Sequence, residues 1–144
     1  MATLRQSVLV HAPVAAVRDA LLDSGSLSKV LGHSCEASAE PGGSFSLWDG
    51  LIRGHNARLG DAEIVQTWRY ALPEWPEGQD SNLILQLREE GGATRVALAQ
   101  NNIPQSCAVA VEEHWREHVW PGIKALLERP QRRDVGRGLL ARLR

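Results

Sequence analysis

The feature that most constrains this chain is a long run of apolar residues at spacings of three and four near its C-terminal end. Over residues 106–128 this spacing predicts one amphipathic helix. At ~1.5 Å per residue the helix is roughly 30 Å long, so its apolar side needs a broad surface to cover it. We expect Ser106 to cap the first turn and Pro121 to kink the helix, because proline lacks a backbone donor. The apolar stripe consists of Val111, Trp115, Val119, Ile123, Leu126 and Leu127.

The residues before this helix are predicted to supply that surface as strands separated by regular turn signals. Asp49 and Gly50 predict a two-residue type I′ hairpin turn, and two short helices are expected at 14–23 and 27–31. Strands joined by hairpins run antiparallel and need one apolar face covered. We therefore predict an α+β helix-grip fold, a curved antiparallel sheet of about seven strands wrapped around the C-terminal helix, with the two short helices between strands 1 and 2. The expected strands cover residues 4–10, 34–39, 44–48, 51–59, 63–71, 82–89 and 94–100.

Charge is distributed unevenly along the 144 residues, although the net charge is only −1. Residues 130–144 hold five Arg and one Asp, a charge of +4, which leaves −5 for the first 129 residues. We expect a single domain at 1–128 followed by a basic, flexible tail at 129–144. The tail is either a solvated extension or a short amphipathic helix at 135–144. Five arginines without interleaved aromatic residues do not favour nucleic acid or membrane as its partner.

Composition also bounds the cellular setting that we expect. No apolar run approaches ~18 residues, so no transmembrane span is predicted. His11 and Pro13 interrupt the N-terminal apolar stretch, which argues against a secretory signal. Cys35 and Cys107 lack metal-type spacing and are too few for a disulfide framework, so we expect buried or half-buried thiols in the reducing cytoplasm.

One motif suggests metal chemistry. His114, Glu117 and His118 spell the H-x-x-E-H pattern of inverted zinc proteases. That pattern needs a further acidic ligand well downstream, and only Glu128 and Asp134 follow it. Both histidines also lie off the apolar stripe. We therefore predict solvent-facing histidines and no metal. Without a G-x-S-x-G elbow or a phosphate-binding loop, we also predict no catalytic residues and no cofactor.

The tryptophans are the candidate contact residues. Trp68 and Trp115 are expected to be core or cavity walls rather than partner contacts. Trp75, bracketed by Pro73 and Pro76, either folds back over a cavity mouth or is offered to a partner. The predicted cavity or partner contacts are Trp48, Trp68, Trp75, Trp115 and Val119.

An ordered set of local motifs over about residues 5–127 resembles the helix-grip, START-like (SRPBCC) superfamily. Within it, the chain is similar to the domain of the activators of the heat-shock protein 90 ATPase (Aha1) in its C-terminal, stand-alone form. One departure is His114, which stands where a glycine before the tryptophan is usual. The separate N-terminal domain of the full-length activators has no counterpart in this sequence. The tail at 129–144 has no counterpart in the family. The matching residues are Gly42, Gly43, Ser44, Phe45, Asp49, Gly50, Gly54, Ile64, Val65, Trp68, Arg69, Trp75, Pro76, Glu77, Gly78, Ile103, Pro104, Trp115, Gly122, Ile123 and Lys124.

The resemblance implies a non-enzymatic, co-chaperone-like binding domain that acts in the stress response and has heat-shock protein 90 as its partner. The alternative is a carrier or sensor of a small apolar ligand held between sheet and helix, as in related families. An enzyme of the cyclase or hydrolase type ranks last, because it needs acid–base residues aimed into the cavity. His55 and Arg69 are the candidates for that role.

The basic tail generates the first testable prediction. Deleting residues 130–144 is expected to weaken binding to an acidic surface of the partner and to flatten its salt dependence, because those arginines supply a screened attraction. Titrating the full and shortened chains with heat-shock protein 90 at several salt concentrations measures both effects. Unchanged affinity with the same salt dependence would dismiss a role for the tail.

Overall fold

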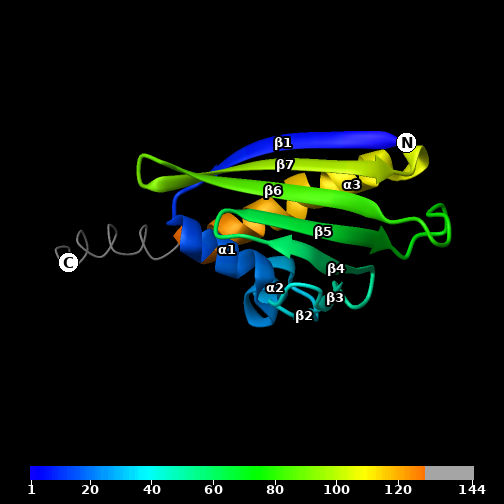
Figure 1. Cartoon of the computed structure of the whole chain (residues 1–144), viewed down its shortest axis with the longest axis horizontal. Coiled ribbons are helices and arrows are strands. Elements are labelled where there is room, and N and C mark those ends of the chain that lie inside the picture. Colours follow the sequence, from blue (N-terminus) through cyan, green and yellow to red (C-terminus); the bar gives the residue numbers. More distant parts are fainter. Residues whose placement is uncertain (129–144) are drawn as a thin grey trace, which may run out of the picture.

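The alternation of apolar and polar residues forms strands that assemble into one seven-stranded antiparallel sheet, which curves around the C-terminal helix (Figure 1). The computed structural model describes residues 1–128, and the predicted tail at 129–144 lies outside the described residues. The strand order is β1-β7-β6-β5-β4-β3-β2, so neighbours in sequence are neighbours in the sheet except for β1, which pairs with β7. This arrangement confirms the predicted helix-grip fold. The strands are β1 (Ala2–Val10), β2 (Glu36–Ala37), β3 (Ser44–Leu47), β4 (Ile52–Leu59), β5 (Glu63–Tyr70), β6 (Ser81–Glu90) and β7 (Ala93–Ile103).

Two short helices between β1 and β2 close one end of the fold (Figure 1). Helix α1 (Val14–Leu22) packs on β6 and β7, and α2 (Ser24–Leu31) packs on the C-terminal helix. The Asp23 carboxylate caps α2 by accepting the backbone N–H of Ser26 at 2.9 Å, which satisfies a donor that the first turn leaves free. Gly32 ends α2 in the left-handed conformation that glycine adopts without strain.

The C-terminal helix is irregular at two points, of which the first differs from the prediction. It starts with a 3₁₀ turn, η1 (Gln105–Cys107), and Ser106 lies inside this turn without capping the helix, so the N-cap prediction was wrong. Helix α3 (Ala108–His114) is followed by a π-helical turn, η2 (Trp115–Val119), and the chain stays helical through residues 120–128. In an α-helix the carbonyl of Glu117 would lack a donor from Pro121, and the wider turn directly before that proline accommodates this loss.

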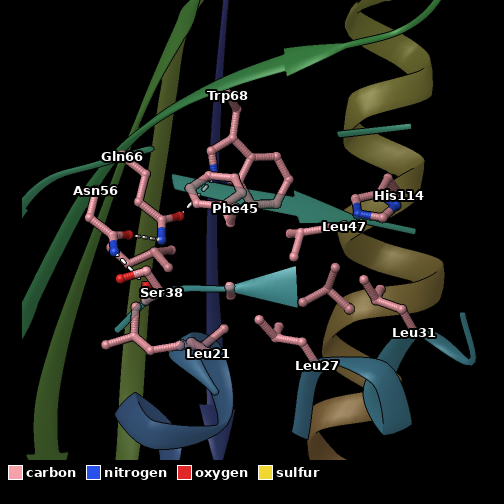
Figure 2. A pocket seen from close by; sticks show the side chains of 14 residues that line it. Leu21, Leu27, Leu31, Ser38, Phe45, Leu47, Asn56, Gln66, Trp68 and His114 are labelled. Carbon is pink, nitrogen blue, oxygen red and sulfur yellow. Dashed lines mark hydrogen bonds between the residues drawn. The ribbon is translucent and has the colours of Figure 1, made fainter. Parts of the chain in front are cut away.

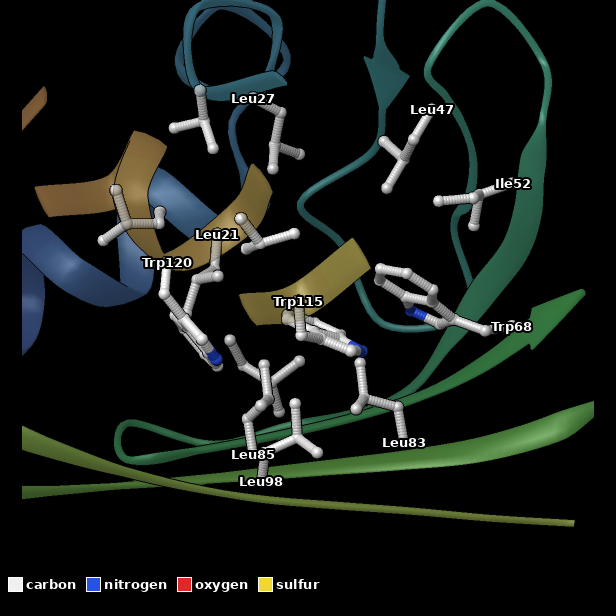
Figure 3. Packing of buried hydrophobic residues seen from close by; sticks show 14 of the residues in the cluster. Leu21, Leu27, Leu47, Ile52, Trp68, Leu83, Leu85, Leu98, Trp115 and Trp120 are labelled. Carbon is white, nitrogen blue, oxygen red and sulfur yellow. The ribbon is translucent and has the colours of Figure 1, made fainter. Parts of the chain in front are cut away.

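Trp115 lies at the centre of the core (Figure 3) and is only 1% exposed. Its indole ring stacks on Trp68 of β5 at a centroid distance of 5.0 Å and lies 5.1 Å from the ring of Trp120. The indole N–H donates to Gln100 of β7 at 2.9 Å. Both Trp68 and Trp115 are therefore core residues.

The loop between β3 and β4 is longer than the predicted two-residue turn. The strand pairing ends at Leu47 opposite Ile52, which leaves residues 48–51 in the loop. Trp48, Asp49 and Gly50 all have positive φ, at 53°, 56° and 89°. Tertiary contacts favour this shape, because the Asp49 carboxylate accepts the backbone N–H of Ser34 and pairs with His33, both at 3.0 Å. The positive φ of both Asp49 and Gly50, with the Leu51 N–H donating to the Trp48 carbonyl at 3.1 Å, agrees with the predicted type I′ turn, and only Trp48 and Leu51 depart from the prediction because they lie outside the strands.

No helix within residues 1–128 has both the length and the apolar character that a bilayer crossing requires.

Gly54 generates a stability prediction. It pairs with Trp68 across β4 and β5, and an added Cβ would overlap the carbonyl oxygen of Thr67 and come within 2.8 Å of the Phe45 ring. We expect Gly54→Ala to lower the free energy of unfolding by about 3 kcal/mol, because backbone cannot move aside as a flexible side chain can. Urea denaturation measures the loss. Gly60→Ala is the control, since nothing lies nearer than 3.8 Å to its added Cβ. Equal effects of the two changes would contradict the prediction.

Candidate functional site

The space between sheet and helix is nearly filled. It leaves an enclosed cavity of about 20 Å³, which has room for about one water molecule and is far below the ~300 Å³ of the smallest typical ligand sites. Figure 2 shows the side chains around it. The cavity is lined by Leu21, Leu22, Leu27, Leu31, Ala37, Ser38, Phe45, Leu47, Asn56, Gln66, Trp68, Leu85, His114 and Val119.

The polar groups on one side of this cavity bond to each other (Figure 2). Trp68 donates its indole N–H to Gln66 at 2.8 Å, and the Gln66 amide donates to Asn56 at 2.9 Å. The Asn56 amide donates in turn to the carbonyls of Ser38 and Glu40. Each member has a partner, so this chain of bonds holds the sheet edge rather than offering free acid–base groups.

The two side chains considered for enzyme chemistry lie elsewhere. His55 is exposed on β4 and its ring nitrogen bonds to the Thr67 hydroxyl at 3.1 Å. Arg69 pairs with Asp80 at 2.8 Å, and both side chains are 42% exposed. Neither residue lines the enclosed cavity.

His114 is the main correction to the sequence analysis. The predicted solvent-facing histidine is only 4% exposed, and neither ring nitrogen has a hydrogen-bond partner. Burial, with a smaller contribution from His118, lowers the pKa of His114 from 6.5 to about 3, so the ring is neutral near pH 7. One signal in the sequence could have indicated this burial. His114 directly precedes Trp115, at a position where the family that the sequence resembles usually has glycine, which has no side chain.

A surface hollow of about 210 Å³ lies on the outer side of His114. Trp48 stacks on His114 at 4.8 Å between ring centroids and meets His118 edge-on at 4.9 Å. Among the residues that line the two spaces, only His114 lines both, so its ring separates the enclosed cavity from the hollow. The hollow is lined by Trp48, Leu51, Tyr70, Leu72, Ala110, Glu113, His114, Glu117 and His118.

Backbone strain occurs at the edge of this hollow. A φ of 53° is unusual for a bulky side chain and costs about 1–3 kcal/mol. Trp48 adopts it while its indole, half-buried, packs on His114, His118 and, at 5.3 Å, His33. The strained conformation directs the indole over the helix instead of into solvent.

The structure separates the five predicted contact residues. Trp68 and Val119 are buried and line the enclosed cavity, and Trp115 is buried deeper. Trp75 is 7% exposed, donates its indole N–H to the Gln79 carbonyl at 2.7 Å and packs on Tyr70 at 5.3 Å, so it is folded back. Trp48 alone of the five is partly exposed. Contact with a partner stays a prediction for all five.

The H-x-x-E-H residues do not converge on one point. Only His114 is buried, and its ring lies 6.1 Å from that of His118. Within the described part of the chain, no three His, Cys, Asp or Glu side chains are grouped as a metal ion requires.

The buried histidine generates a prediction about pH. The unfolded chain binds a proton at residue 114 below pH ~6.5, whereas the folded chain stays neutral there down to about pH 3, so the free energy of unfolding falls as the pH drops through this window. When the pH falls from 8 to 5, we expect the free energy of unfolding of His114→Phe to decrease by about 2 kcal/mol less than that of the unchanged chain. Urea denaturation at the two pH values measures this difference. The control is His55→Gln, which should keep the original pH dependence, and an unchanged pH dependence in His114→Phe would contradict the burial argument.

Comparison with known proteins connects this fold to a family. Residues 11–128 match the family described as Activator of Hsp90 ATPase homolog 1-like protein. An activator of 90 kDa heat shock protein ATPase homolog from Dictyostelium discoideum is 32% identical over 108 residues, which are 74% of this chain and 28% of that protein. The chain thus spans under a third of the length of this relative.

Solved structures agree with the fold. An HSP90 activator from Plasmodium falciparum superposes with a TM-score of 0.80 at 21% identity, over 86% of this chain and 94% of that one. An Aha1 dimer from Colwellia psychrerythraea superposes with a TM-score of 0.73 at 16% identity, over 89% of this chain and 97% of that one. The family match extends over nearly all the described residues, and we conclude that the chain belongs to the family of Activator of Hsp90 ATPase homolog 1-like proteins.

Proposed function

We propose that this chain is a non-enzymatic binding module that docks on heat-shock protein 90 and alters its ATPase cycle as part of a stress response. The observation that carries the proposal is the family match over residues 11–128, with a curated relative named as an activator of that ATPase. The relative is more than three times as long as the matched region, so stimulation by this chain alone is the part that most needs testing.

The packing of the core favours this function over a ligand carrier. A carrier needs a cavity that holds its cargo, and the enclosed cavity of about 20 Å³ has no room for a lipid or a polyketide. The polar groups of Asn56 and Gln66 are already hydrogen-bonded to the protein, so a cargo would find few free partners there. The interior therefore supports the shape of the domain, and binding is assigned to its surface.

Trp48 is the contact that we propose for the partner. Aromatic side chains that keep part of their surface exposed are frequent anchors at protein interfaces. Trp48 lies in a strained loop and its indole stacks on His114. The side chain is therefore already ordered and would lose little conformational entropy on binding. The two free cysteines, Cys35 and Cys107, are both buried and suit a cytoplasmic setting for this role.

Calorimetric titration into heat-shock protein 90, together with an ATPase assay of the chaperone, tests the proposal. We expect binding in the micromolar range and a raised turnover that a specific inhibitor of the chaperone abolishes. Trp48→Asn should weaken binding about thirtyfold, because one aromatic anchor contributes about 2 kcal/mol. Asparagine tolerates a positive φ, so the loop should keep its shape.

The control is Ile84→Thr, which changes a half-buried side chain on β6 between the buried Leu83 and Leu85 and therefore on the outer face of the sheet. It should leave binding unchanged. No binding of the unchanged chain to the chaperone would contradict the proposal. Equal losses in the two variants would contradict the role of Trp48 alone.

A further inference from the structure

Two residues that line the hollow beside His114 carry buried polar atoms that have no partner within residues 1–128. Among the described residues, the buried side-chain polar atoms without a hydrogen bond are the Tyr70 hydroxyl and the two ring nitrogens of His114. Both residues are 4% exposed and both line the hollow. Buried polar atoms nearly always have a partner, so their coincidence here calls for a ligand that supplies one.

We propose that this hollow is a binding site for a primary alkylammonium group, carried either by a free amine or by a lysine side chain of another protein. The inference goes beyond the proposed function, because it concerns the chemistry of one site and holds whether or not the chaperone is the partner.

The unpaired atoms of His114 and Tyr70 favour a ligand that donates hydrogen bonds. A neutral imidazole offers one acceptor nitrogen, and a phenol oxygen also accepts. Burial keeps both groups uncharged, since it raises the pKa of Tyr70 far above its ordinary value and lowers that of His114. The carboxylates of Glu113 and Glu117 at the rim are acceptors only. An ammonium group brings three donors to these acceptors, while the imidazole N–H and the phenol O–H are donors that it leaves to other acceptors.

The negative charge at the rim of the hollow favours a cationic ligand. Glu113 and Glu117 are exposed at the rim, and Glu113 forms no salt bridge with any residue in 1–128. Arg116 pairs with Glu112 and, at 3.3 Å, with Glu117, so Glu113 is the rim carboxylate that has no ion pair within residues 1–128. An anion would meet repulsion from Glu113, whereas an ammonium group would be attracted by it.

Aromatic rings and size narrow the ligand further. Trp48, Tyr70 and His118 present rings to the hollow, and the faces of tryptophan and tyrosine attract cations. A volume of about 210 Å³ suits a short alkyl stem, such as the end of a lysine side chain, and excludes a lipid. Leu51, Leu72 and Ala110 supply apolar walls for that stem.

The test is a nuclear magnetic resonance titration of the full chain with n-butylammonium chloride. The indole N–H signal of Trp48, identified by its absence in Trp48→Asn, should shift and saturate in the millimolar range, as the small ligand allows. 1-Butanol and sodium butyrate, at matched ionic strength, should cause no saturable shift. A shift with butanol equal to that with butylammonium would overturn the proposal.

Charge variants sharpen the test. The double change Glu113→Gln and Glu117→Gln keeps the shape of the rim and should weaken butylammonium binding roughly tenfold, because it removes both nearby negative charges. Asp61→Asn is the matched control. It removes an exposed carboxylate from the turn at the far end of the β4–β5 hairpin, roughly 30 Å along the strand from Tyr70 at ~3.3 Å per residue. An equal loss in Asp61→Asn would overturn the site by showing only a net-charge effect.

A second arm distinguishes the two sources of the ammonium group. A short lysine-containing peptide with blocked ends is titrated beside n-butylammonium. Tighter binding of the peptide assigns the site to a lysine of a protein, and equal or weaker binding assigns it to a free amine. If neither probe causes a saturable shift, the proposal is overturned, and that result leaves chaperone binding untouched because no chaperone is present.

Discussion

The fold depends on a line of buried hydrogen bonds that joins the C-terminal helix to three adjacent strands, β7, β6 and β5. The Trp115 indole donates to Gln100 on β7, the Gln100 amide donates to the Ser81 hydroxyl on β6, and that hydroxyl donates to the Trp68 carbonyl on β5, at 2.9, 2.9 and 2.8 Å. Apolar packing alone tolerates sliding and rotation of a helix on a sheet, but directional bonds in a low-dielectric core do not. This line therefore fixes both the rotation and the axial position of the helix.

The position of His114 follows from that constraint. Once Trp115 points at Gln100, the residue before it is rotated by about 100° around the helix axis and meets the loop that carries Trp48. The π-helical turn adds a second consequence. The Trp120 backbone N–H donates to the Trp115 carbonyl, and this five-residue spacing brings the two indoles within 5.1 Å of each other. A regular α-helix would have rotated Trp120 away from that contact.

Sequence patterns were sufficient where structure is set by periodicity and insufficient where it is set by contacts distant in sequence. Alternation and turn signals predicted the strands and their antiparallel pairing, and spacing of three and four predicted the long helix with Trp115 on its apolar side. Ser106 and His114 were wrongly predicted, and the strands on either side of the 48–51 loop are each one residue shorter at the loop than predicted. Two of these positions depend on tertiary partners, because Ser34 and His33 bind Asp49 in the loop and Trp48 packs on His114. Ser106 lies in the 3₁₀ turn through which the chain passes from β7 into the helix. Helix periodicity assigns a residue to a face, but it does not say how far the sheet wraps around that face.

The unfavourable terms in this structure are concentrated in one place, which is the argument for placing recognition at the hollow. Within residues 1–128, the unpaired buried polar atoms belong to Tyr70 and His114, at about 1–3 kcal/mol for each such group. The strained φ of Trp48 adds about 1–3 kcal/mol at the same position. The enclosed cavity shares only His114 with the hollow, and the polar side chains of Asn56 and Gln66 that also line it bond to the protein itself. Stability alone would favour a phenylalanine at 114 and a glycine at 48, whereas a ligand or partner that bonds to these groups would offset their cost.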